Sequence, residues 1–145
     1  RFFACSIRCI EGLAVTDGDT DKTVRLYAQA LKSLTTSEKI TVTLGFRNYL
    51  INDFIKNSRT YAAGGEKAFK ALQAATVRLC IINFLILGAK AAKQDTVIED
   101  VLIEAVSSSS RSFEHNTILV DQISEMLNAV EVQSPAMLGL IAPNI

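Results

Sequence analysis

A run of apolar residues in the middle of the chain places the strongest constraint on its fold. Residues 79–89 read Leu-Cys-Ile-Ile-Asn-Phe-Leu-Ile-Leu-Gly-Ala, and they continue a segment with helical spacing, so residues 66–92 are predicted to form one helix. The unbroken apolar run is far shorter than the roughly 20 residues that a membrane span needs, and Arg78 and Asn83 interrupt it. A helix buried on all sides by neighbouring helices is the better interpretation.

Further segments carry helical periodicity or helix-start signals, and the low content of two prolines and seven glycines favours long regular elements. These expected helices are residues 1–15, 21–34, 38–57, 96–111 and 117–130. We therefore predict an all-α fold: a single helical bundle of about six helices around the central apolar helix. We expect this bundle to be one domain over residues 1–130.

Three stretches fit this pattern less well. Residues 40–44 alternate like a strand, which leaves the start of the third helix ambiguous. Residues 59–65 are expected to be a loop that ends at a glycine pair. Residues 131–145 hold both prolines and are expected to be an extended C-terminal tail, whose apolar residues 137–141 can dock on the bundle.

Several polar residues are predicted to start helices. Thr96 and Glu99 have the spacing of a capping box, in which each side chain accepts from a free backbone N–H of the first turn. Asp19 or Thr20 is expected to cap the second helix, and residues 35–38 can cap the third.

Composition narrows the class of protein. Fifteen basic residues balance fifteen acidic ones, so the basic excess typical of nucleic-acid or anionic-membrane binding is missing, and we expect neither partner. The chain opens in an apolar pattern without methionine and without signal-peptide features, which predicts a fragment of a larger protein. The odd number of three cysteines without a secretory signal favours a reducing, cytoplasmic location.

The sequence offers little catalytic chemistry of its own. It has no phosphate-binding loop and no nucleophile elbow, and its single histidine excludes a multi-histidine metal site. Cys5 and Cys9 share one helix face, either as half of a metal site or, the favoured interpretation, as small buried apolar side chains. We predict no metal site, leave the catalytic residue unknown, and expect the fragment alone to be inactive.

One polar grouping lies at a predicted helix junction. Arg111, Glu114 and His115 stand between two amphipathic segments, and residues three or four apart share a helix face. They are candidates for a substrate or partner contact. The favoured alternative is a structural junction in which Arg111 pairs with Glu114 and His115 lies near a helix C-terminus.

A second grouping lies on the third predicted helix. Asn48, Tyr49 and Asn52, followed by Asp53 and Asn57, are spaced so that they can line a polar groove. The alternative, again favoured, is a solvated helix face opposite an apolar stripe.

These motifs, taken together, resemble one protein family. Residues 48–57 resemble the N-Y-L-x-N-x-F-x-K-N helix of bacterial flagellin lysine N-methylases, and residues 110–116 resemble their S-R-x-x-E-H-N signature. The apolar residues 77–89 lie where that family has an apolar helix. The resemblance covers about residues 46–130.

The resemblance implies a C-terminal helical domain of an enzyme that transfers methyl groups from S-adenosylmethionine to flagellin lysines. It also implies an iron–sulfur cluster in a cysteine-rich N-terminal part, so no cofactor is expected in this fragment. The implied partners are flagellin and the remainder of its own chain, and the implied role is to support the catalytic part or dock substrate. The alternative is a non-enzymatic helical interaction module, such as a chaperone or regulator.

Overall fold

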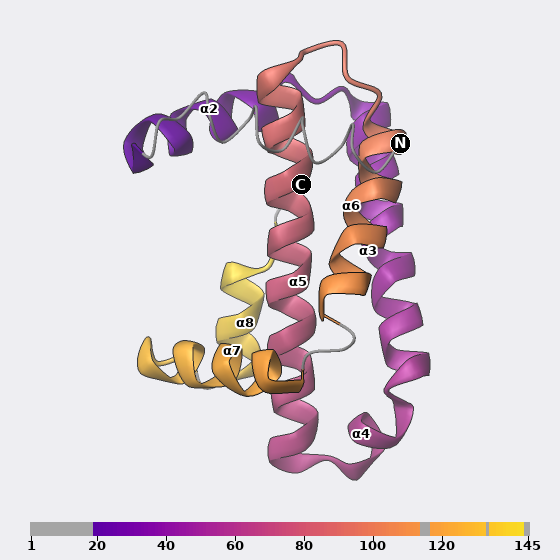
Figure 1. Ribbon diagram of the computed structural model, residues 1–145, viewed down its shortest axis with the longest axis vertical. Helices are drawn as coiled ribbons and strands as arrows, with labels where there is room; N and C mark the ends of the chain where they lie inside the picture. Colours follow the sequence, from indigo (N-terminus) through magenta and orange to yellow (C-terminus); the bar gives the residue numbers. More distant parts are fainter. Residues whose placement is uncertain (1–18, 114–116, 133, 144–145) are drawn as a thin grey trace. The chain divides into compact units, whose positions relative to one another are not determined.

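Regular structure in this protein is helical throughout the part that the structure describes. The computed structural model describes residues 19–113, 117–132 and 134–143 (Figure 1). The helices there are α2 (Thr20–Ser33), α3 (Thr36–Lys56), α4 (Ser58–Ala63), α5 (Gly65–Ala92), α6 (Ile98–Phe113), α7 (Thr117–Ala129) and α8 (Pro135–Ile141). No strand occurs among those residues, so the all-α prediction is confirmed, and residues 40–44 are helical within α3. The helix expected at residues 1–15 lies outside the described residues.

Two segments differ from expectation. The expected loop at residues 59–65 is largely the short helix α4. Gly64 separates α4 from α5, which begins at Gly65, and the two glycines have φ angles of 66° and 59°. Glycine adopts this left-handed region without the steric cost that a Cβ brings. The expected extended tail is wrong for Pro135–Ile141, which form α8 after the Ser134 side chain accepts a hydrogen bond from Met137 N–H. The domain division stays a prediction.

The contacts between residues divide the chain into two compact units. Among described residues, one unit comprises 19–45 and 82–108, and the other comprises 46–81 and the described residues from 109 to 143. Helices α3, α5 and α6 each contribute residues to both units.

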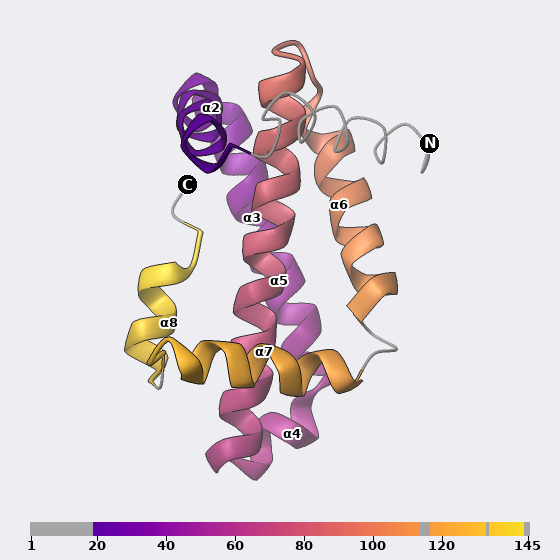
Figure 2. The ribbon, with the colours of Figure 1, turned by 60° about the vertical axis from the view of Figure 1, so that its left-hand side comes forward.

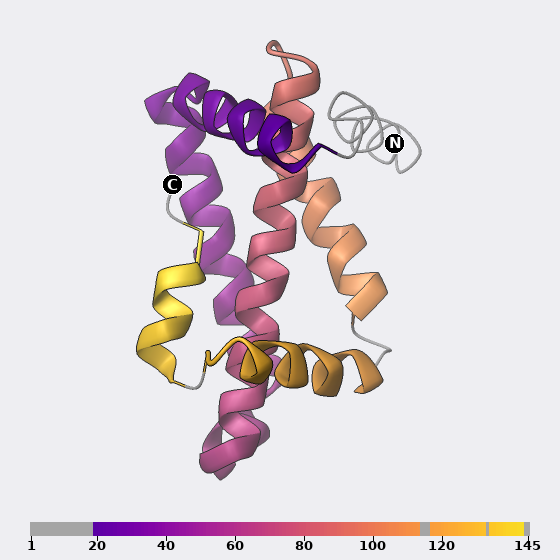
Figure 3. The ribbon, with the colours of Figure 1, turned by 90° about the vertical axis from the view of Figure 1, so that its left-hand side faces the viewer.

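In the first unit, α2 lies across the C-terminal part of α5 (Figure 3). The ring of Tyr27 stacks on Phe84 with centroids 4.5 Å apart, and a Cβ built at Gly88 would lie 2.5 Å from the Tyr27 hydroxyl oxygen. Leu102 of α6 occupies the space that a side chain at Gly45 would need. The side chains that are fully buried in this unit include Val42, Ile82, Ile86, Ala89, Val101 and Ala105.

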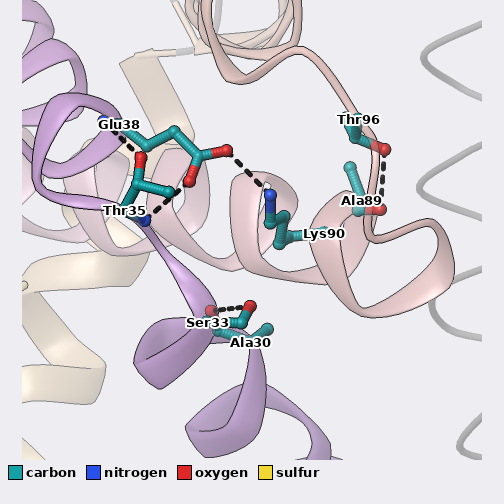
Figure 4. A network of polar contacts seen from close by, with 7 residues as sticks. All are labelled: Ala30, Ser33, Thr35, Glu38, Ala89, Lys90 and Thr96. Carbon is teal, nitrogen blue, oxygen red and sulfur yellow. Dashed lines mark hydrogen bonds and ion pairs between the residues drawn. The ribbon is translucent and has the colours of Figure 1, made fainter.

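A polar network joins α3 to the end of α5 in the same unit (Figure 4). Thr35 and Glu38 form a reciprocal capping box, and Glu38 Oε1 lies 2.7 Å from Lys90 Nζ. This hydrogen bond is the main reason that the pKa of Glu38 is lowered. The capping box expected at Thr96 is not the start of α6, because α6 begins at Ile98 and the Thr96 hydroxyl donates to the Ala89 carbonyl (3.3 Å).

In the second unit, α7 crosses the N-terminal half of α5 (Figure 2). Gln73 of α5 is fully buried, its Oε1 accepts from the Ser124 hydroxyl (2.8 Å), and its Nε2 donates to the Val132 carbonyl (3.3 Å). A buried amide is stable only when its polar atoms find partners, so Gln73 fixes α7 and the following turn to α5. Leu138 of α8 is also buried.

Among the described helices, α5 alone is long and apolar enough to cross a membrane by length and composition. Half of its most apolar window is buried inside the structure, and the core helix of a soluble protein passes the same test. Its buried residues include Gln73 and Lys90, whose polar atoms find partners on other elements.

Candidate functional site

A buried carboxylate organises the polar chemistry of the second unit. Asp53, in the last turn of α3, is only 9% exposed. Its Oδ1 accepts from Arg78 Nη1 of α5 at 3.2 Å, and this pair is also an ion pair. Oδ1 also accepts from Asn57 Nδ2 (3.0 Å), and Oδ2 accepts from the Tyr61 hydroxyl (2.8 Å). These donors replace the water that a carboxylate this buried has lost.

The local sequence explains how these groups meet. Asp53 and Asn57 are one helical turn apart, and α4 follows at once and carries Tyr61 back toward the carboxylate. The Tyr61 ring also stacks on Phe54, with centroids 4.2 Å apart. Burial, and then the hydrogen bond to Asp53, raise the pKa of Tyr61 well above its ordinary value. Tyr61 therefore stays protonated and acts as a donor.

A pocket of about 270 Å³ opens beside this carboxylate, between the end of α3, α4 and the start of α5. Its lining contains three basic residues and one acidic residue, together with small and neutral polar side chains. These residues are Asp53, Asn57, Thr60, Lys67, Lys70, Ala71, Ala74 and Arg78.

The two lysines of the pocket differ in their surroundings. Lys70 Nζ lies 3.1 Å from Glu66 and 3.8 Å from Asp121, and the hydrogen bond that Lys70 donates to Glu66 is the main reason that the pKa of Lys70 is raised. Both carboxylates are largely exposed, so their attraction is screened by water. Lys67 is exposed and has no carboxylate within 4.0 Å in the part of the chain that is described.

The sequence-predicted candidates fall in different places. Asn48 and Asn52 are exposed on α3 and Tyr49 is half-buried, and none of the three lines the pocket. Arg111 is exposed in the last turn of α6, whereas Glu114 and His115 lie outside the described residues. The polar junction and the roles of all six residues therefore stay predictions.

Spacing in the sequence groups Asp53 with Asn57, but it does not identify their partners. In the sequence, Arg78 stands out only as an interruption of an apolar helix, and Tyr61 falls in an expected loop. The charge of Arg78 is the sequence signal for a buried pair, because an arginine inside an apolar helix is buried only when it is paired.

The iron–sulfur cluster implied for the whole enzyme does not fit the described residues. No group of three or more His, Cys, Asp or Glu side chains there is placed to hold a metal. Cys80 is the one cysteine described; it is half-buried, and burial raises the pKa of its thiol, so the thiolate that ligates a cluster is disfavoured. Cys5 and Cys9 lie outside the described residues.

Fold and pocket together define an all-α helical domain with a small basic site. The chain belongs to the family of FliB lysine N-methylase C-terminal domains, whose sequence model matches residues 1–140. The match confirms the resemblance and extends beyond the residues that carried it. Searches of curated proteins and of solved structures found no match.

Proposed function

We propose that this domain serves the S-adenosylmethionine-dependent methylation of flagellin lysines in the bacterial cytoplasm, by supporting the catalytic part of the enzyme or by docking flagellin. The observation that carries the proposal is the family match over residues 1–140, to the C-terminal domain of a lysine N-methylase. The cofactor and the iron–sulfur cluster are then held by the rest of the enzyme. The balanced charge of the chain supports a protein partner over nucleic acid or an anionic membrane.

An exposed apolar surface supports a role in protein contact. Ile51, Phe54 and Ile55 of α3 are 45%, 46% and 68% exposed. Their spacing of three and four residues places them on one helix face. Apolar side chains gathered on a surface are typical of protein interaction sites.

The test uses the whole enzyme with Ile51→Ser and Ile55→Ser combined, and Val24→Ser of α2 as the control, because Val24 is similarly exposed at 61%. Methyl transfer from labelled S-adenosylmethionine is measured against flagellin concentration. A raised KM for flagellin with unchanged kcat supports docking, because only substrate binding is weakened.

A lowered kcat with loss of association to the N-terminal part supports the scaffold role instead. If the double variant changes neither the KM for flagellin nor kcat, and the Val24→Ser control stays equally active, a contact role for this surface is contradicted. Full methylation by an enzyme that lacks the domain favours the alternative, a non-enzymatic interaction module.

A further inference from the structure

We propose that the pocket between α3, α4 and α5 binds a single oxyanionic group, a carboxylate or a phosphate, of a ligand outside this chain. The inference goes beyond the proposed function and does not depend on it. The pocket lies wholly within the second unit, so its shape is set by contacts inside that unit.

The charge of the lining is the first argument. Three basic residues, Lys67, Lys70 and Arg78, face one acidic residue, Asp53, which leaves a formal excess of +2 (three minus one) on the pocket wall. Asp53 is already compensated by its ion pair with Arg78 and by two further donors. Its carboxylate is therefore poorly placed to hold a cation.

The acidic neighbours of Lys70 do not remove this excess. Glu66 and Asp121 are not part of the lining, and their side chains are 80% and 68% exposed. Exposed ion pairs of this kind contribute little to stability, so Lys70 can exchange these carboxylates for an anion in the pocket. Lys67 has no such pair among the described residues and is the cation best placed to meet an incoming anion.

The neutral lining residues and the volume of the pocket limit the kind of anion that its cations can bind. Asn57 and Thr60 add side chains that donate hydrogen bonds, and Ala71 and Ala74 leave room between the charged side chains. A volume of about 270 Å³ admits one acidic head group. Charge-assisted hydrogen bonds from lysine and arginine are the usual way that proteins hold carboxylate and phosphate.

The same chemistry excludes a lysine side chain as the ligand. An ammonium group in this pocket meets the positive side chains of Lys67 and Lys70, whereas the Asp53 carboxylate is already paired with Arg78. The pocket is therefore not the site that receives a lysine to be methylated.

The test is a titration of the full chain, labelled with ¹⁵N, with acetate, inorganic phosphate and methylammonium at constant ionic strength. We expect saturable shifts of the Ala71 and Ala74 amide signals with acetate or phosphate, and none with methylammonium. Lys67→Gln should weaken this binding by about fivefold or more, because one charge-assisted contact is lost. Lys32→Gln, which changes another exposed lysine that is not part of the pocket lining, should leave the binding within about twofold, since salt screens exposed charges outside the pocket.

Two peptides distinguish the source of the anion. One carries a glutamate and the other carries glutamine at the same position. Binding of the glutamate peptide alone, displaced by acetate, assigns the ligand to an acidic side chain of a protein. Binding of phosphate and neither peptide assigns it to a free or bound phosphate. No saturable response to either anion, a response to methylammonium, or an undiminished response in Lys67→Gln overturns the proposal.

Discussion

Removing the Asp53 carboxylate tests the buried cluster of the second unit. Asp53→Ala removes the carboxylate that forms an ion pair with the Arg78 guanidinium, and the Arg78 and Asp53 side chains are only 13% and 8% exposed. Breaking a buried ion pair by removing one partner typically costs about 3–5 kcal/mol, because the remaining charge stays away from water. The hydroxyl of Tyr61 loses its acceptor in the same change, so we expect a loss within that range.

Urea unfolding followed by far-ultraviolet circular dichroism measures this loss. Asp121→Ala is the matched control: its carboxylate is 68% exposed and 3.8 Å from Lys70, so we expect no measurable change. The double variant Asp53→Ala with Arg78→Met should lose less than the sum of the single changes, with a coupling of about 0.5–3 kcal/mol. A loss below about 1 kcal/mol for Asp53→Ala, or simple additivity, would refute the reasoning.

Three further outcomes follow from the packing of the first unit. Ile86→Ala should lower the free energy of unfolding by about 2–5 kcal/mol, because the side chain is fully buried; a chemical denaturation curve close to that of the parent chain would contradict this. Gly88→Ala should destabilise by about 1–3 kcal/mol, since the new Cβ would lie 2.5 Å from the Tyr27 hydroxyl oxygen, and adding Tyr27→Phe should recover part of the loss in thermal melting. The lowered pKa of Glu38 means that its pair with Lys90 stabilises the fold above the ordinary pKa of 4.5, and that this stabilisation is lost as pH falls through the folded-state pKa. The stability difference between the parent chain and Lys90→Met should therefore be largest at neutral pH and shrink in acid, and a constant difference would exclude the linkage.

The helices that sequence could predict are those with a strong local signal. The apolar run at residues 79–89 lies within α5 as predicted, but Phe84 is 37% exposed, so the expectation that this helix is buried on all sides is wrong. Asp19 and Thr35 cap α2 and α3 as their side chains predict. By contrast, α4 and α8 are short and stand next to glycines or prolines, so local signals favoured a loop and a tail. The start of α8 does carry a local signal, Ser134 as N-cap followed by Pro135, whereas α4 has no side-chain cap and contacts α3 through Tyr61.

The candidate site was predictable only in part, because its residues come from different helices. Asp53 and Asn57 are one turn apart and were grouped by spacing alone. Arg78 joins them from 25 residues away along the chain, across a turn whose geometry depends on Gly64 and Gly65. Periodicity shows which side chains share a face of one helix, but it does not show which helices meet.

Methyl transfer by the whole enzyme, with and without this domain, tests the central claim most directly. Labelled S-adenosylmethionine and flagellin are incubated with the intact enzyme, with the enzyme lacking the domain, and with the 145-residue chain alone. The account predicts methylated flagellin lysines with the intact enzyme, a strong loss without the domain, and no incorporation above background with the chain alone. Undiminished methylation without the domain, or methylation by the chain alone, would contradict it.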